Sequence, residues 1–157
     1  MKLTLERAAL LSSLGHIQSV VERRNTIPLL SNVEFVAAEG HLSLAATNLD
    51  LALRESVPAE VERGGGTTTP AHMLYDIVRK LPDGAQIEFS QDGEGERLSL
   101  RAGRSEFSLP CLPREDFPVI SEGELPVQFE LATADLKRLI DKTRFAISTE
   151  ETRYYLN

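Results

Sequence analysis

The chain has few of the cysteines and histidines that disulfide-stabilised and metal-binding folds require. It contains one cysteine, Cys111, and three histidines, at positions 16, 41 and 72, that lack the spacing of metal ligands. A lone cysteine cannot form an internal disulfide, and scattered histidines do not build a zinc site. We therefore expect a fold that depends on its hydrophobic core and holds no metal.

Long apolar runs are also missing. No stretch approaches the roughly 18 apolar residues of a membrane-spanning helix, and Glu6 and Arg7 stand where a signal peptide would carry its apolar segment. The sequence predicts a cytoplasmic protein with no membrane partner.

The composition is that of a globular protein. The chain has 157 residues, of which 41% are hydrophobic and 26% charged, and its formal net charge is −7. This length suits one complete domain and part of a second. Taken as a bulk property, the negative charge argues against a nucleic-acid partner.

Hydrophobic periodicity predicts alternating strands and three helices. In the first helix, Leu10, Leu14, Ile17 and Val21 fall on one face. We expect strands at residues 2–5, 32–38, 42–46, 49–55, 57–62, 86–90, 97–102 and 105–109, and helices at residues 6–23, 70–81 and 133–146. Thr69 and Pro70 resemble an N-cap followed by a first-turn proline, and the glycines at 64–66 resemble a flexible loop.

These elements form an internal repeat. A strand, a helix and three strands occur twice before residue 110, which predicts an α+β fold built from duplicated β-α-β-β-β units. Shifting the sequence by 126 positions places Leu3 on Phe129 and Leu10 on Leu136. We therefore expect one domain at residues 1–126, with an extended connector from residue 112, and the beginning of a second domain at residues 127–157, where the chain stops early.

The positive charge is concentrated in the helices. The segments 6–24, 70–81 and 133–146 hold nine basic and five acidic residues, whereas the rest of the chain carries a net −11. If all helices lie on one side of the sheets, that side attracts a phosphate backbone without reading bases. The alternative is that Lys and Arg are simply solvated helix formers.

No set of residues predicts an active site. The glycines at 64–66 lack the lysine of a phosphate-binding loop. Asp92, Glu94 and Glu96 lie on an expected hairpin tip, where solvation is a simpler interpretation than ion binding. Cys111 suits an inert, half-buried thiol, and His16 and His72 suit solvated helix faces. We expect neither catalysis nor a cofactor.

Two aromatic features have two interpretations each. Tyr154 and Tyr155 are adjacent on an expected strand, so that one can be buried while the other contacts a ligand. Phe107 and Leu109 alternate on another strand, either as core residues or as part of a partner interface at a sheet edge.

Four segments, in order, resemble one family. RNTIPLLSN at 24–32, LSLAATNLDLAL at 42–53, LRAGRSEFSLPCLPREDFP at 100–118 and RYYLN at 153–157 are similar to the N-terminal part of the bacterial DNA sliding clamp, the beta subunit of DNA polymerase III. The resemblance implies a DNA clamp fold, in which helices line the hole of a homodimeric ring around duplex DNA.

The resemblance also implies residue roles. Those expected to bind DNA are Arg24, Arg79, Arg138, Tyr154 and Tyr155; those at the dimer interface are Arg104, Phe107 and Leu109; those at the partner-peptide groove are Arg153 and Leu156. Three positions depart from the family pattern in ways that weaken the expected local attraction for DNA. His72 and Glu106 replace basic residues, and Glu150 replaces a polar one.

The implied function is that of a non-catalytic processivity factor. Its implied partners are double-stranded DNA, the DNA polymerase III catalytic subunit, the clamp loader, and other DNA polymerases and repair proteins. The alternative is a small acidic α+β ligand-binding or protein-interaction domain, and it stays open on the charge pattern alone.

Overall fold

A computed structural model describes residues 1–23, 26–92, 95–118, 127 and 129–148. The chain divides into two units, Met1–Ile120 and Ser121–Asn157. Each unit is described by itself.

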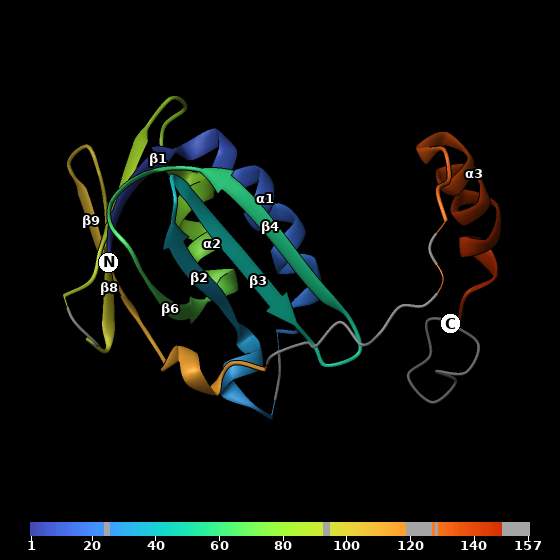
Figure 1. Cartoon of the computed structure of the whole chain (residues 1–157), viewed down its shortest axis with the longest axis horizontal. Coiled ribbons are helices and arrows are strands. Elements are labelled where there is room, and N and C mark those ends of the chain that lie inside the picture. The colour runs from blue at the N-terminus through green and yellow to red at the C-terminus, as the bar shows by residue number, and fades with distance from the viewer. Residues whose placement is uncertain (24–25, 93–94, 119–126, 128, 149–157) are drawn as a thin grey trace. The chain divides into compact units, whose positions relative to one another are not determined.

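The first unit contains two antiparallel sheets (Figure 1). The five-stranded sheet has the order β5-β1-β7-β8-β9 and the four-stranded sheet the order β4-β3-β2-β6. The strands are β1 (Lys2–Glu6), β2 (Asn32–Ala38), β3 (His41–Thr47), β4 (Ala52–Pro58), β5 (Glu60–Arg63), β6 (Gly65–Pro70), β7 (Gln86–Ser90), β8 (Arg97–Ala102) and β9 (Ser105–Pro110).

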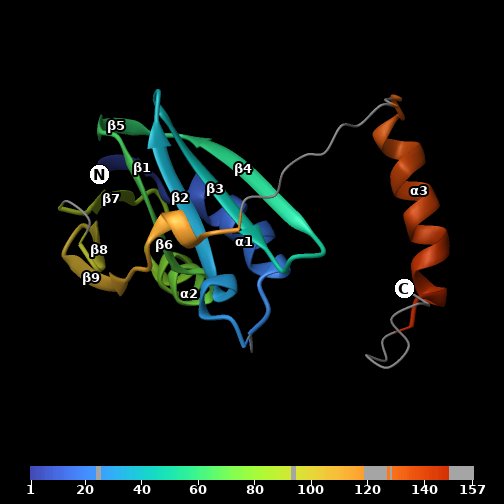
Figure 2. The same ribbon diagram turned by 60° about the horizontal axis from the view of Figure 1, so that its bottom comes forward.

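Two helices, α1 (Arg7–Val20) and α2 (Ala71–Lys80), lie side by side behind the four-stranded sheet in both views (Figures 1 and 2). They are antiparallel, because the start of each helix bonds to the end of the other. The apolar stripe of α1 is buried as its spacing predicts. It joins the inward faces of both sheets in one core, in which Phe35 and Phe89 make an edge-to-face contact with ring centroids 5.4 Å apart.

The predicted duplication is present, and in addition the two halves exchange their first strands. Each half places one strand before its helix and three strands after it, and the first half adds the short strand β5, but the first strand of each half pairs within the other half's sheet. Thus β1 pairs with β7, and β6 pairs with β2, both antiparallel. The halves therefore share their sheets, and neither half holds a complete sheet of its own.

The segment before α2 was predicted wrongly. The glycines expected to form a loop include the first residues of β6, and Thr69 is a strand residue whose hydroxyl donates to the Pro110 carbonyl at 3.2 Å. Pro70 itself is the N-cap of α2 and makes no side-chain cap bond. Expected strand 49–55 begins three residues late, because residues 48–51 form a turn in which the Asn48 side chain accepts from the Leu51 amide at 2.8 Å.

The outer edge of β6 is covered by the segment that follows β9. The amide of Leu112 donates to the Thr68 carbonyl at 3.3 Å, and the Thr68 hydroxyl donates to the Leu112 carbonyl at 3.0 Å. A short 3-10 turn, η2 (Arg114–Asp116), then brings Phe117 into a small buried cluster with Leu29 and Ala45. An edge covered in this way is protected from pairing with another strand.

The second unit contains helix α3 (Thr133–Thr143) and a 3-10 turn, η3 (Arg144–Ala146), where the sequence predicted one helix over 133–146. The helix is amphipathic, but none of its residues is buried in this structure. Its apolar stripe of Leu136, Leu139 and Ile140 is about half exposed.

Candidate nucleic-acid interface

Helix α1 presents a narrow exposed stripe made of Ala8, Ser12, His16 and Ser19. The helix contains no Asp or Glu, although the whole chain carries a net charge of −7. Small and hydroxyl-bearing side chains allow another surface to approach the helix backbone closely. A helix face without carboxylates of its own adds no like-charge repulsion toward a phosphate backbone.

His16 is the titratable group of this stripe. Its Nδ1 lies 2.6 Å from Oε1 of Glu55 on β4. The imidazole remains largely exposed while the carboxylate is mostly covered. The prediction that His16 lies on a solvated helix face is confirmed, with a carboxylate partner, Glu55, that the sequence did not reveal.

Helix α2 contributes exposed cations near its C-terminal end. Arg79 and Lys80 are both exposed. The Arg79 guanidinium donates to Oδ1 of Asp76 at 3.2 Å, and its central carbon lies 5.6 Å from the Tyr75 ring centroid. Both contacts are made at the surface, so they orient the guanidinium while leaving it accessible to an anion.

Arg7 does not contribute to this surface, although its charge counts toward the basic total of the helices. Its guanidinium donates to the carbonyls of Val78 at 3.1 Å and Arg79 at 2.9 Å, and it forms an ion pair with Asp83. The side chain is only 12% exposed. A positive charge is unfavourable in the first turn of its own helix, so the position of Arg7 in the sequence indicates that it interacts with another element. In the structure Arg7 satisfies the last carbonyls of α2.

His72 makes the reciprocal bond at the opposite end of the pair. Its Nε2 lies 2.8 Å from the carbonyl oxygen of Val21, the residue that follows α1. The prediction of a solvated His72 is wrong, because the ring is half-buried and its Nδ1 is buried without a hydrogen-bond partner among the described residues. Nothing in the local sequence indicates this contact.

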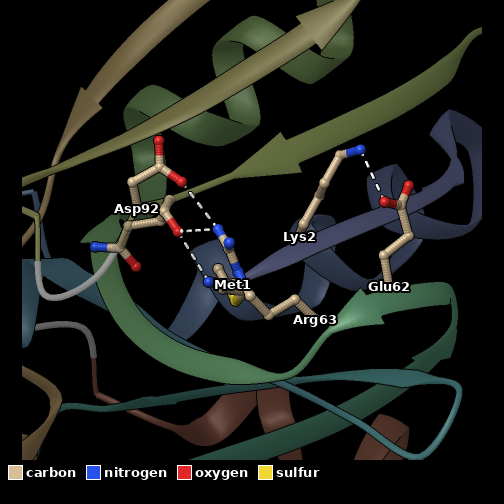
Figure 3. A network of polar contacts seen from close by, with 6 residues as sticks. Met1, Lys2, Glu62, Arg63 and Asp92 are labelled. Atoms are coloured by element: carbon tan, nitrogen blue, oxygen red, sulfur yellow. Dashed lines mark hydrogen bonds and ion pairs between the residues drawn. The ribbon is translucent and has the colours of Figure 1, made fainter.

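Several basic side chains outside the helices are held by acidic partners. Lys2 Nζ lies 2.8 Å from Oε2 of Glu62, and Arg63 lies 2.9 Å from Oδ1 of Asp92 while also donating to the Gln91 carbonyl (Figure 3). Two more pairs are Arg114 with Glu34 and Arg101 with Glu106. Arg79 is paired in the same way, with Asp76, so pairing alone does not separate these cations from those of α2.

The residues expected at the dimer interface lie on or beside β9, the outer strand of the five-stranded sheet. Arg104 is exposed in the turn before the strand, and Phe107 is half-buried against the core. Leu109 is 1% exposed, so its side chain is a core residue. Because Leu109 is buried, it can support an interface only by holding β9 in place in the sheet.

Other expected site residues are divided between the second unit and the undescribed positions. Arg138 is exposed on α3 and donates to Oδ1 of Asp135 at 3.2 Å. Six residues, Arg24, Glu150, Arg153, Tyr154, Tyr155 and Leu156, lie outside the described residues.

The described residues offer no metal centre. They contain no cluster of three or more His, Cys, Asp or Glu side chains able to hold an ion. A cavity of about 190 Å³ lies between β6 and the segment after β9, with Thr67, Gln91 and Cys111 in its lining. Burial raises the pKa of the Cys111 thiol above its ordinary value, which keeps the thiol protonated and unreactive.

No helix among the described residues is both long enough and apolar enough to cross a membrane.

The chain is similar to known bacterial proteins over its whole length. The Beta sliding clamp of Caulobacter vibrioides (strain NA1000 / CB15N) is 59% identical over 157 residues, which cover 100% of this chain and 42% of that protein. The Beta sliding clamp of Escherichia coli (strain K12) is 41% identical over 158 residues, covering 100% of this chain and 43% of that protein. The solved structure of Caulobacter crescentus pol III beta matches with a TM-score of 0.93 at 58% identity, covering 100% of this chain and 42% of that one.

This chain therefore spans less than half the length of these relatives. The family model for the DNA polymerase III beta subunit, N-terminal domain, matches residues 1–121. Together with the duplicated α+β architecture, this match shows that the chain belongs to the DNA polymerase III beta subunit family.

Proposed function

We propose that this chain forms the first domain, residues 1–126, and the beginning of the second domain, residues 127–157, of a DNA sliding clamp. In this proposal the clamp encircles duplex DNA as a homodimeric ring and tethers the replicative polymerase. It is a non-catalytic processivity factor without a cofactor. It acts in the cytoplasm, where bacterial DNA is replicated.

The carboxylate-free face of α1 is the observation that carries the proposal. In a chain with 24 acidic residues, a 14-residue helix without one is unusual. Helix α1 packs against α2, whose Arg79 and Lys80 supply exposed positive charge. Counterions released when such cations approach phosphates favour binding to any duplex.

The same face supports sliding rather than sequence recognition. Reading base edges requires rigid donors and acceptors that enter a groove. The exposed groups of α1 are two hydroxyls, a methyl group and the His16 imidazole, which is bonded to Glu55, and the cations of α2 are on long side chains. They suit contact with the backbone, which is the same at every base pair.

The proposed ring uses β9 as its interface strand, with Phe107 and the buried Leu109 on the strand and Arg104 in the turn before it. An outer strand has unpaired backbone groups that can bind another strand edge. Glu106 reverses the charge expected there, and its carboxylate lies 3.4 Å from the Arg101 guanidinium. The strand that pairs with β9 in the ring therefore meets a Glu106 carboxylate whose charge is balanced by Arg101.

Further roles rest on the resemblance alone. We propose that Arg24, Tyr154 and Tyr155 contact DNA together with Arg79 and Arg138, and that Arg153 and Leu156 border the groove for partner peptides. The partners proposed for the complete clamp are the polymerase III catalytic subunit, the clamp loader, and other polymerases and repair proteins.

The DNA-binding part can be tested by fluorescence anisotropy with two labelled duplexes of unrelated sequence. We expect weak binding that is equal for both duplexes and falls as salt rises, with a slope of about −0.9 per neutralised phosphate. Arg79→Ala should weaken binding and make the slope shallower by about one phosphate equivalent.

Arg101→Ala is the matched control. It removes the same charge from β8, outside the two helices, and should change affinity little. Affinity that does not depend on salt, or an equal loss for Arg79→Ala and Arg101→Ala, would contradict the proposed DNA face.

A further inference from the structure

His72 and Arg7 form a reciprocal pair of end-to-end contacts between α1 and α2. Arg7, the first residue of α1, donates to the Val78 and Arg79 carbonyls in the last turn of α2. His72, the second residue of α2, lies 2.8 Å from the Val21 carbonyl just after α1. Each helix start therefore holds the end of the other helix.

The His72 contact has a defined direction. A carbonyl oxygen only accepts hydrogen bonds, so Nε2 must carry the proton and His72 is the donor. The other nitrogen, Nδ1, is buried and has no hydrogen-bond partner among the described residues. A buried polar atom without a partner is costly, and the hydrogen bond made by Nε2 is the interaction of this ring that offsets the cost.

The carbonyl that His72 binds belongs to the beginning of an arginine-bearing segment. Val20 is the last residue of α1, Val21 is its buried C-cap, and Arg23 is exposed two residues later. The backbone leaves the helix at Val21 with φ −83° and ψ 116°. A bond to this carbonyl fixes the plane of the peptide from which the Arg23 segment departs.

We infer that His72 is a positioning residue for DNA binding, which acts by holding the exit of α1 so that Arg23 faces the phosphate backbone. This inference rests on the proposed function and assigns no direct DNA contact to the imidazole. It gives this position, where the family resemblance expects a basic residue, a role that needs no positive charge.

Two substitutions of His72 separate the bond from the space that the ring fills. His72→Leu keeps an apolar side chain but removes the donor, whereas His72→Gln provides an amide N–H with a similar reach. We expect His72→Leu to accelerate amide hydrogen exchange around residues 20–23 about fivefold, as loss of one hydrogen bond predicts. His72→Gln should restore the exchange rates.

DNA binding then distinguishes positioning from general destabilisation. In anisotropy titrations, His72→Leu should weaken binding by about threefold to tenfold, as loss of a single surface charge contact predicts, and make the salt slope shallower by at most about 0.9. Combined with Arg23→Ala, it should cause no loss beyond that of Arg23→Ala alone, because both changes remove one phosphate contact.

Arg79→Ala is the matched control, because Arg79 lies at the opposite end of α2 and its loss should add fully to that of His72→Leu. Additive losses for His72→Leu and Arg23→Ala, or failure of His72→Gln to restore binding, would overturn the positioning role while leaving the DNA face intact. A wild-type chain without salt-dependent DNA binding would instead refute the proposed function, and the role of His72 with it. Unchanged hydrogen exchange in His72→Leu would overturn the inference whatever the DNA result.

Discussion

Replacing Arg7 tests the contact that holds the two helices together. Arg7→Met keeps most of the side-chain length but removes every donor. Two hydrogen bonds from a charged group to carbonyls, at 3.1 and 2.9 Å, are lost. Such bonds contribute about 1.5 to 3 kcal/mol each. Water can rehydrate part of a helix end, so we expect a net loss of about 3 kcal/mol in the free energy of unfolding.

Urea unfolding followed by far-UV circular dichroism measures this loss, since the chain has no tryptophan for fluorescence. With an m-value of about 2 kcal/mol/M, the midpoint should fall by about 1.5 M. The urea midpoint of Arg7→Lys should lie between those of the unmodified protein and Arg7→Met, because one ammonium group cannot replace the forked guanidinium.

Asp83→Asn is the matched control for the Arg7 substitution. It removes only the ion pair, and the Asp83 side chain is 98% exposed. A pair with such an exposed partner contributes less than about 1 kcal/mol. If Arg7→Met costs no more than Asp83→Asn, the carbonyl contacts do not stabilise the helix pair and the reasoning fails.

Three further predictions concern the core, a turn and the half-buried thiol of Cys111. Phe89→Ala should destabilise the first unit by about 3 to 5 kcal/mol in urea unfolding, because it opens a cavity beside Phe35. Gly103→Ala should cost about 1 kcal/mol in the same assay, because φ is +57° there although the surrounding space is open. Because burial raises the pKa of Cys111 in the folded state, stability should fall as pH rises above 9.0, the ordinary pKa of the thiol, where the unfolded thiol ionises first. Urea midpoints measured against pH should show this decline relative to Cys111→Ala, and parallel curves for the two proteins would contradict it.

Strands with one buried face were predictable from the sequence. The strands at 32–38, 86–90 and 97–102 have the predicted bounds, because a strand with one buried face alternates between hydrophobic and polar residues. The stripe of α1 was predictable for the corresponding reason at a period of 3.6. In both cases the signal lies within the element itself.

The signal for β6 lies outside the element. Its glycines carry no side chain to show periodicity, and Thr67, Thr68 and Thr69 are all buried instead of alternating. Hydroxyls tolerate burial here because distant groups satisfy them, such as the Leu112 and Pro110 carbonyls. Partners about forty residues away cannot be inferred from a local window.

The candidate site shows the same division between local and distant information. The basic excess of the helices is visible in the composition, but a count treats every cation as solvated. Arg7 and His72 turn inward to backbone carbonyls of the neighbouring helix. Only the packing of α1 against α2 shows which basic groups remain available to a ligand.

The exchange of first strands explains why this packing follows from the fold. Because β1 belongs to the sheet of the second half and β6 to the sheet of the first, each helix crosses from a strand of one sheet to a strand of the other. Two such crossings, related by the internal repeat, bring α1 and α2 together in antiparallel directions on one side of the sheets. Each helix start then lies beside the end of the other, where a donor such as Arg7 or His72 can satisfy carbonyls that the helix leaves unpaired. The duplication thus produces a continuous two-helix surface, and the absence of carboxylates from α1 makes that surface suitable for a polyanion.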